Sequence, residues 1–508
     1  MTIDGVSGRT NYLGTSILNL KSQIDTLTEQ LSSGKKANTY SGLGIQSGFA
    51  TGLRSQLSAI SAYSDTATML NTRIGVVNLS LQGLIDAGSE TKSAASGSTL
   101  TLNAQGQTPG QQTANSSFAQ AIALLNTESG GRYLFSGRAT DTPSTASADD
   151  ILNGTTTQAG LRQLISERKT ADLGTATPPT GRLVTAQTGT SVSISEDATG
   201  SPFGFKLSAI SSSLTGSTVT APPSPAPTLP APPAAMSVDL GATNPKDGDK
   251  VQFTFTLPDG TSESISLTAS SQTPPPAGSF AIGADTTATA ANLKSAVDSA
   301  VGTLANGPLV AASAVAASNN FFDDPPKRVG SSPLGSATTL VAGTPANTVS
   351  WYTGEKGTDS ARGTAVVSID PSISVQYGAR ADESAIRTQL QNIAVYAAVT
   401  TNPNDPNANA QITALNQRVQ ANLAVQPGAQ SIQNIQADFA GTQAAIKSAT
   451  TRQTQTSSMA QTMLDSIEGI DDNTVATQIL ALQTSLQASY QTTATLYQTS
   501  LLKYLPIG

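Results

Sequence analysis

The residue types that most often perform catalysis are scarce in this chain. Its 508 residues include neither cysteine nor histidine, which excludes thiolate nucleophiles, cysteine-ligated metals and the usual general base near neutral pH. Neighbouring carboxylates can act as an acid–base pair, and such pairs occur at Asp149/Asp150, Asp323/Asp324 and Asp471/Asp472. Each pair stands in a polar or turn-like stretch, where acidic residues usually begin helices or face water. The sequence therefore predicts no enzyme, no cofactor and no metal site.

The clearest pattern in the sequence lies at its two ends. Apolar residues near the start alternate in steps of four and three, which is the spacing of a helical seam: Leu13, Ile17, Leu20, Ile24, Leu27 and Leu31. A similar seam near the end, which we extend through the tyrosines, comprises Val475, Ile479, Leu482, Leu486, Tyr490, Leu496, Tyr497 and Leu501. Because such a seam is buried only against another helix, we expect the first and last segments to pair.

Composition favours a structural protein. Aromatic residues make up 4% of the chain and charged residues 12%, which is unusual for a globular enzyme but suits long helices that stack closely on copies of themselves. The net charge of -7 and the absence of a Lys/Arg cluster argue against nucleic acid as a partner. The start, MTIDGVSGRT, lacks the features of a cleaved secretory signal, and no stretch has the apolar length of a membrane span.

The middle of the chain differs from the ends. Helical periodicity is present at about 11–34, with Gly34 as a stop, and again at 53–97, 113–128 and from 381 onward. It mostly disappears between 139 and 380, where Thr, Val, Ser, Gly and Pro favour short strands. A hairpin is expected over 251–267, followed by a helix that starts near Asp285.

Several motifs occur in an order that is specific to one family. The stretch QLSSGKKANTYSGLG at 30–44 resembles the segment after the first helix of bacterial flagellins, with matches at Leu31–Lys35 and at Gly42 and Leu43, and a departure at Asn38–Ser41. The segments GRYLFSGRATDTP at 131–143 and WYTGEKG to ADES at 351–384 resemble hook-filament junction proteins, which are flagellin relatives. The ending YQTSLLKYL at 497–505 does so too.

The resemblance implies a self-assembling subunit of the bacterial flagellum. Flagellin-like proteins leave the cell through the flagellar type III apparatus without a cleaved signal peptide and polymerise outside it. The expected partners are copies of the chain itself, the hook-associated proteins, the filament cap and an export chaperone. We also expect Tyr133, Phe135 and Gly137 to form an elbow, which packs a helical rod onto an outer domain, rather than a ligand site.

The resulting fold class is mainly α with a β-rich insert. Long antiparallel terminal helices are expected to form a coiled-coil rod, and the centre to form β or α+β outer domains. We assign 1–40 and 471–508 to inner-core terminal helices, 41–138 and 381–470 to a rod, 139–220 and 303–380 to a β-rich outer domain, 221–236 to a Pro-rich linker, and 237–302 to a ββα insert. Deleting 221–350 is then expected to leave assembly intact.

Three functions remain open at this point. The long insert favours a filament flagellin, whereas the motifs near the end favour a hook-filament junction protein. A third alternative is an extracellular adhesin or binding module that is held on a coiled-coil stalk.

Overall fold

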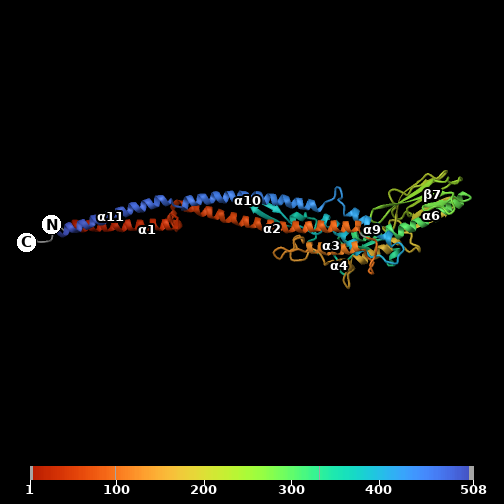
Figure 1. Ribbon diagram of the computed structural model, residues 1–508, viewed down its shortest axis with the longest axis horizontal. Helices are drawn as coiled ribbons and strands as arrows, with labels where there is room; N and C mark the ends of the chain where they lie inside the picture. The colour runs from red at the N-terminus through yellow and green to blue at the C-terminus, as the bar shows by residue number, and fades with distance from the viewer. Residues whose placement is uncertain (1–3, 98, 331, 503–508) are drawn as a thin grey trace, which may run out of the picture. The chain divides into compact units, whose positions relative to one another are not determined.

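The computed structural model combines long helices with several small sheets, as predicted (Figure 1). It describes residues 4–97, 99–330 and 332–502, and the side chains from residue 11 to residue 498 among them. The chain forms two compact units. The terminal unit comprises the described residues up to Thr72, Val367–Val375, and those from Gln443 onward, and the central unit comprises Arg73–Val366 and Gln376–Thr442.

The terminal unit is built from helices of both chain ends. Helix α1 (Asp4–Ser33) packs along α11 (Asp472–Leu502), and the two run antiparallel, because Lys35 pairs with Gly469 at one end and Leu27 lies opposite Leu482 further along (Figure 1). The unit also contains η1 (Tyr40–Gln46), the first part of α2 (Ser47–Gly97) and the last part of α10 (Ile432–Glu468).

The helix boundaries follow from local signals. Gly34 takes a positive φ of 69° after the last turn of α1, and its N–H donates to the carbonyl of Gln30, which confirms the predicted stop. Asp471 caps α11, because its carboxylate accepts the N–H groups of Asn473 at 3.0 Å and Thr474 at 3.2 Å. These bonds, chiefly those from Thr474, lower the pKa of Asp471.

Strands β11 (Val366–Asp370) and β12 (Ile373–Gln376) form a small two-stranded sheet, and Pro371 lies between them. In the terminal unit, the amide of Gln453 on α10 donates to the carbonyl of Ile369 at 2.6 Å. This bond and the ion pair of Arg452 with Asp370 hold β11 against α10.

The helical part of the central unit surrounds one buried helix. Helix α7 contacts α5, α6, α8 and α9, and α3 packs on α8. The bounds are α3 (Pro109–Leu125), α4 (Ala148–Asn153), α5 (Leu161–Leu173), α6 (Thr286–Asn306), α7 (Pro308–Phe321), α8 (Ser384–Ala398), α9 (Ala408–Asn422), η2 (Leu334–Ser336) and η3 (Ala361–Thr364). Helices α5 and α7 lie where the sequence predicted mainly strands.

The strands of the central unit form two four-stranded sheets and a short pair. One sheet has the order β1 (Leu183–Thr188), β2 (Ser191–Glu196), β5 (Ala235–Asp239), β4 (Thr218–Thr220). The other has the order β3 (Lys206–Ser212), β6 (Lys250–Thr256), β7 (Ser262–Ser270), β8 (Ser279–Ala281). Strands β9 (Lys327–Val329) and β10 (Leu340–Ala342) form the pair.

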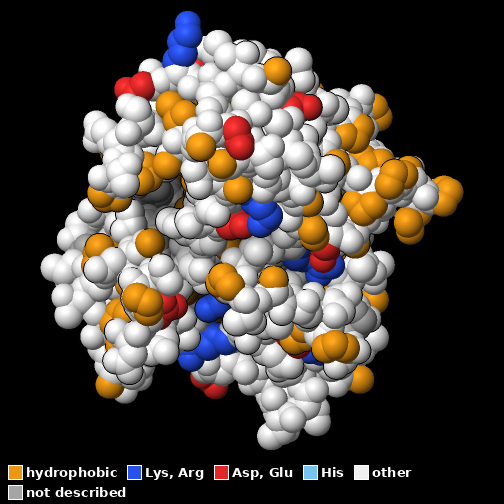
Figure 2. Space-filling model, turned by 90° about the vertical axis from the view of Figure 1, so that its right-hand side faces the viewer, with side chains coloured by type: hydrophobic (Ala, Val, Ile, Leu, Met, Phe, Trp, Pro, Cys, Tyr) orange, Lys and Arg blue, Asp and Glu red, His pale blue; other side chains and the backbone are white. Residues whose placement is uncertain are grey.

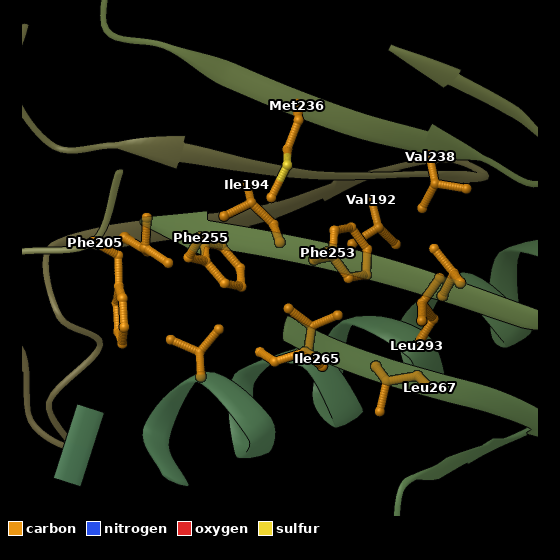
Figure 3. Close-up of a cluster of buried hydrophobic side chains, with 14 of the residues drawn as sticks. Val192, Ile194, Phe205, Met236, Val238, Phe253, Phe255, Ile265, Leu267 and Leu293 are labelled. Carbon is orange, nitrogen blue, oxygen red and sulfur yellow. The ribbon is translucent and has the colours of Figure 1, made fainter. Parts of the chain in front are cut away.

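The two larger sheets and α6 enclose one apolar core. Side chains from β2, β5, β6 and β7 and from α6 point toward one another in this core (Figure 3). Strands β6 and β7 are the predicted hairpin, in which Phe253 lies opposite Ile265 and Val251 opposite Leu267. Asp285 caps α6 through the N–H of Ala288, also as predicted.

The Pro-rich segment connects two strands of one sheet. Residues 221–234 leave β4 and enter β5, and these strands are direct neighbours, with Thr220 opposite Ser237. The segment is therefore a loop within a sheet rather than a connection between two separate bodies.

The range 221–350 also contains α7, whose side chains are buried almost throughout, and Phe322, which packs on Trp351. Deleting the whole range would remove the centre of the unit, so it does not test a separable insert. Replacing only 222–230 with an Asn-Gly turn should change the unfolding free energy of the central unit by less than about 1 kcal/mol, because Thr220 and Ser237 are already paired. Chemical unfolding followed by Trp351 fluorescence measures this.

A network of buried charges joins α5 to the loops around it. Arg168 donates to Asp172 at 2.8 Å, and the N–H of Gly204 donates to the same carboxylate at 2.9 Å. Arg182 donates to the carbonyls of Ala171 at 3.2 Å and Ala337 at 2.8 Å. Arg168, Asp172 and Arg182 are all buried, so each charge depends on these partners.

Polar uncharged side chains and backbone predominate on the face drawn in Figure 2, where Lys, Arg, Asp and Glu are scattered. This matches the low charge content of the chain.

Candidate subunit-packing surface

The predicted seams of the two terminal helices face each other. The side chains of Leu13, Ile17, Leu20, Ile24 and Leu27 are half-buried on α1, at the positions that turn toward α11. Leu31, at the end of this seam, is 39% exposed. On α11 the side chains that turn toward α1 form an inner row, in steps of four and three: Val475, Ile479, Leu482, Leu486, Ser489, Thr493 and Leu496.

Pairing covers these seams incompletely. Of the inner row only Val475 is buried, and the others are half-buried. A surface groove runs between the two helices and is lined by Ser22, Thr26, Leu27, Gln478, Ala481 and Leu482. Since a seam of this spacing packs best when each side chain enters a hole of a facing helix, a single pair of helices leaves apolar surface unused.

Two of the predicted seam residues lie on another face of α11. Tyr490 is 52% exposed and Tyr497 is 58% exposed, whereas the inner row passes through Ser489 and Leu496. The tyrosines belong to an outer row of exposed side chains, also spaced by three and four: Leu480, Gln483, Gln487, Tyr490, Ala494 and Tyr497. The backbone of Leu501 belongs to α11, but its side chain lies outside the described residues.

The two rows give α11 two faces that can each contact another helix. Each outer residue is one position after an inner residue, so the rows are about 100° apart around the helix. The sequence from Asn473 to Leu502 contains no Asp, Glu, Lys or Arg. An exposed helix usually carries charges on its water-facing side, so α11 has the composition of a helix that is enclosed by other helices.

The motif at Leu31–Lys35 lies at the base of the terminal helix pair. Here the N–H of Lys36 donates to the carbonyl of Glu468 at 2.7 Å, and the N–H of Ile470 donates to the carbonyl of Gly34 at 3.2 Å. Arg54 on α2 donates to both carboxylate oxygens of Glu468, through Nε at 3.0 Å and Nη2 at 2.5 Å. The break after α1 and the break after α10 are thus tied together.

The predicted elbow residues lie in the central unit. Phe135 is fully buried, and its carbonyl accepts the N–H of Ala381 at 2.9 Å, while Tyr133 and Gly137 are half-buried. The hydroxyl of Tyr133 bonds to Glu128, which raises the pKa of Tyr133.

Two motifs with the family resemblance meet at the elbow. The N–H of Glu355 donates to the carbonyl of Ser136 at 2.9 Å, and the N–H of Gly137 donates to the carbonyl of Ala379 at 3.2 Å. Arg138 forms ion pairs with Glu355 and Asp359. The segments 131–143 and 351–384, far apart in the sequence, therefore lie against each other.

Substituting Gly137 tests how tightly the elbow is packed. Its φ is +66°, and a Cβ there would lie 3.0 Å from the Cβ of Glu355. Gly131 has a φ of +71° but no atom within 4 Å of such a Cβ, so it is a matched control. We expect Gly131→Ala to cost about 1–2 kcal/mol of stability through its backbone conformation alone.

The contact adds to that cost in Gly137→Ala, which should lose about 1–3 kcal/mol more. Chemical unfolding of the central unit, followed by Trp351 fluorescence, measures the difference. Equal losses in the two variants would contradict the tight packing of the elbow.

The acidic pairs stand where helix starts and surface charge were expected. Asp149 and Asp150 lie in the first turn of α4, and Asp472 lies in that of α11. Asp323 and Asp324 form surface ion pairs with Lys327 and Lys356. The described part of the chain contains no group of three or more acidic residues placed to hold a metal ion.

Among the described helices, none is by itself both long and apolar enough to cross a membrane, and only the bent pair of α6 and α7 meets that criterion together.

A comparison with models of known protein families finds none that matches the chain, and a search of curated proteins likewise finds no match.

Proposed function

We propose that the chain is the structural subunit of a bacterial flagellar filament, which polymerises outside the cell. In this proposal the chain has no catalytic role. Its partners are further copies of itself, the hook-associated proteins, the filament cap and an export chaperone.

The observation that carries the proposal is the outer row of α11. Leu480, Tyr490 and Tyr497 are exposed at helical spacing on a helix without charges, next to a row that is already in contact with α1. Burying a large apolar side chain is worth roughly 1.5–3 kcal/mol, so a neighbouring helix that covered this row would be strongly held.

Such a contact joins unlike surfaces of two copies. The outer row of one copy would meet a different surface of the next copy, such as the groove between α1 and α11. Contacts of this heterologous kind do not close on themselves unless the rotation is right, and they generate open helical filaments. We propose that α1 and α11 act in the filament as a coiled-coil rod.

The distribution of apolar surface supports the same role. Most of the large apolar side chains that are exposed in the described chain belong to the terminal unit, although it is the smaller of the two. The examples outside α11 include Tyr12, Leu18, Ile45 and Phe49. Exposed apolar surface in such amounts is typical of protein–protein contact regions.

A hook-filament junction protein is the second candidate. The sequences 131–143, 351–384 and 497–505 favour it, since they are most similar to that branch of the family. The location of the chain separates the two functions. A filament subunit occurs along the whole length of sheared filaments, whereas a junction protein is confined to a few copies at the base.

Seeded growth tests the proposed function directly. Purified full-length chain is mixed with short fragments of its own filaments and then sedimented. The proposal expects the chain to enter the pellet in proportion to the number of seeds. A chain that stays monomeric with and without seeds would favour the adhesin instead.

A further inference from the structure

The base of the terminal helix pair contains a feature that packing alone does not require. The helical path is interrupted twice at the same level, after Ser33 and after Glu468. The two interruptions are joined by backbone hydrogen bonds from Lys36 and Ile470, and the amine of Lys36 donates to the carbonyl of Ser466 at 2.9 Å. If α1 and α11 move relative to α2 and α10 within the terminal unit, the chain has to bend at these two breaks.

An ion pair between Arg54 and Glu468 joins a third helix, α2, to these breaks. The Glu468 side chain is only 10% exposed, and both of its oxygens are bound by Arg54. The guanidinium of Arg54 in turn lies 5.9 Å from the centre of the Tyr40 ring. A two-pronged contact between guanidinium and carboxylate fixes the orientation of both groups more firmly than a single contact does.

Among the acidic groups nearby, Glu468 is the one whose charge holds Arg54 in place. Lys35 and Lys36 follow α1, and Tyr40 lies in η1, where Lys35, Tyr40, Arg54 and Glu468 line one small cavity. Two other acidic residues lie near Glu468 in the sequence. Asp465 accepts a hydrogen bond from Gln461, and Asp471 caps α11. Each of these two acids is therefore engaged elsewhere.

We propose that the Arg54–Glu468 pair is a latch that holds the terminal helix pair in its assembly geometry, and that protonation of Glu468 opens it. The proposal rests on the proposed function for its consequence, because an open latch would release the terminal helices from their neighbours. The latch itself is a property of the single chain.

The direction of the pH dependence follows from the contact. The hydrogen bonds and the charge of Arg54 hold the pKa of Glu468 below its usual value. The contact therefore stabilises the closed state fully above the usual pKa of a glutamate, and this contribution is lost as the pH falls through the lowered value. The latch stays closed at neutral pH and opens in acid.

Whether the latch is open or closed in the full-length chain can be measured by hydrogen exchange. The readout is the protection of the N–H groups of Lys36 and Ile470, corrected for intrinsic exchange rates. The wild type should be protected at neutral pH and lose protection in acid. Glu468→Gln should already be less protected at neutral pH, by about tenfold or more, and should show no acid step at these amides. Glu29→Gln is the control, since it removes a nearby carboxylate that accepts the side-chain amide of Asn38 and takes no part in the contact between Arg54 and Glu468.

Two further variants separate a latch from general damage. Arg54→Lys keeps the charge but loses the two-pronged contact, so its protection should fall between those of the wild type and Glu468→Gln. Exchanging the partners, with Arg54→Glu and Glu468→Arg together, should restore protection. An unprotected wild type, or an acid step that is unchanged in Glu468→Gln, would overturn the latch.

The assembly measurement keeps the two proposals apart. If particles form, those of Glu468→Gln should already release subunits at neutral pH, where those of the wild type are stable. If no particles form, the proposed function fails and the exchange data still decide on the latch. If particles form and release subunits at the same pH in both proteins, the latch fails and the proposed function stands.

Discussion

Two aspartates on the inner row of α11 should abolish assembly. Leu482 and Leu486 turn toward α1, and replacing both with Asp would place two charges in the contact between the helices. Burying an unpaired carboxylate costs several kcal/mol, which exceeds what the pairing of two half-buried seams can supply. We expect Leu482→Asp/Leu486→Asp to leave the fluorescence of Trp351 unchanged, because the central unit is not altered, and to leave no sedimentable particles.

The outer row gives a sharper version of the experiment. Tyr490→Asp/Tyr497→Asp should preserve the pairing of α1 with α11, since both tyrosines are exposed in the single chain, and should still prevent assembly. Thr484→Asp/Gln491→Asp adds the same charge to the same helix but touches neither row, so it should assemble. Normal assembly of the tyrosine variant would show that the outer row is not a contact surface.

The largest expected effect on folding is at Asp172. Its carboxylate is fully buried between Arg168 and the N–H of Gly204, so Asp172→Asn leaves the charge of Arg168 buried without its partner. Breaking a buried ion pair from one side typically costs about 3–5 kcal/mol. Chemical unfolding followed by Trp351, the single tryptophan of the chain, measures the loss in the central unit.

An exposed ion pair serves as the control for Asp172. Asp324 bonds to Lys356 at 2.7 Å, but both side chains are more than half exposed. Asp324→Asn should therefore change the stability of the central unit by at most about 1 kcal/mol. Similar losses in Asp172→Asn and Asp324→Asn would contradict the role assigned to the buried network.

The sequence predicted the parts of the fold that are set by local patterns. The stop at Gly34, the hairpin of β6 and β7, and the start of α6 at Asp285 each depend on residues within a few positions of one another. The seams of α1 and α11 could also be read, because amphipathic spacing records which face of a helix is covered.

The sequence did not predict helices α5 and α7, because burial removes the amphipathic pattern by which a helix is recognised. Helix α7 is covered on nearly all sides, so buried Ala, Val and Ser residues occur around its circumference and show no amphipathic period. Helix α5 places Arg168 and Asp172 on its buried face, which makes that face look like a surface. Their partners come from distant segments, and no local signal announces such pairs.

The tyrosines of α11 show a finer limit. Tyr490 and Tyr497 are apolar enough to continue the seam, and only the structure separates them from their neighbours Ser489 and Leu496, which lie on the inner row. The elbow is similar, since nothing in the sequence near Gly137 specifies that Glu355 and Ala379 will pack on it.

Electron microscopy of the purified full-length chain, grown from seeds, tests self-assembly most directly. The proposal predicts long filaments with helical order, in which the terminal helices lie at the contacts between subunits. Particles that remain single chains at every concentration, with seeds present, would contradict it.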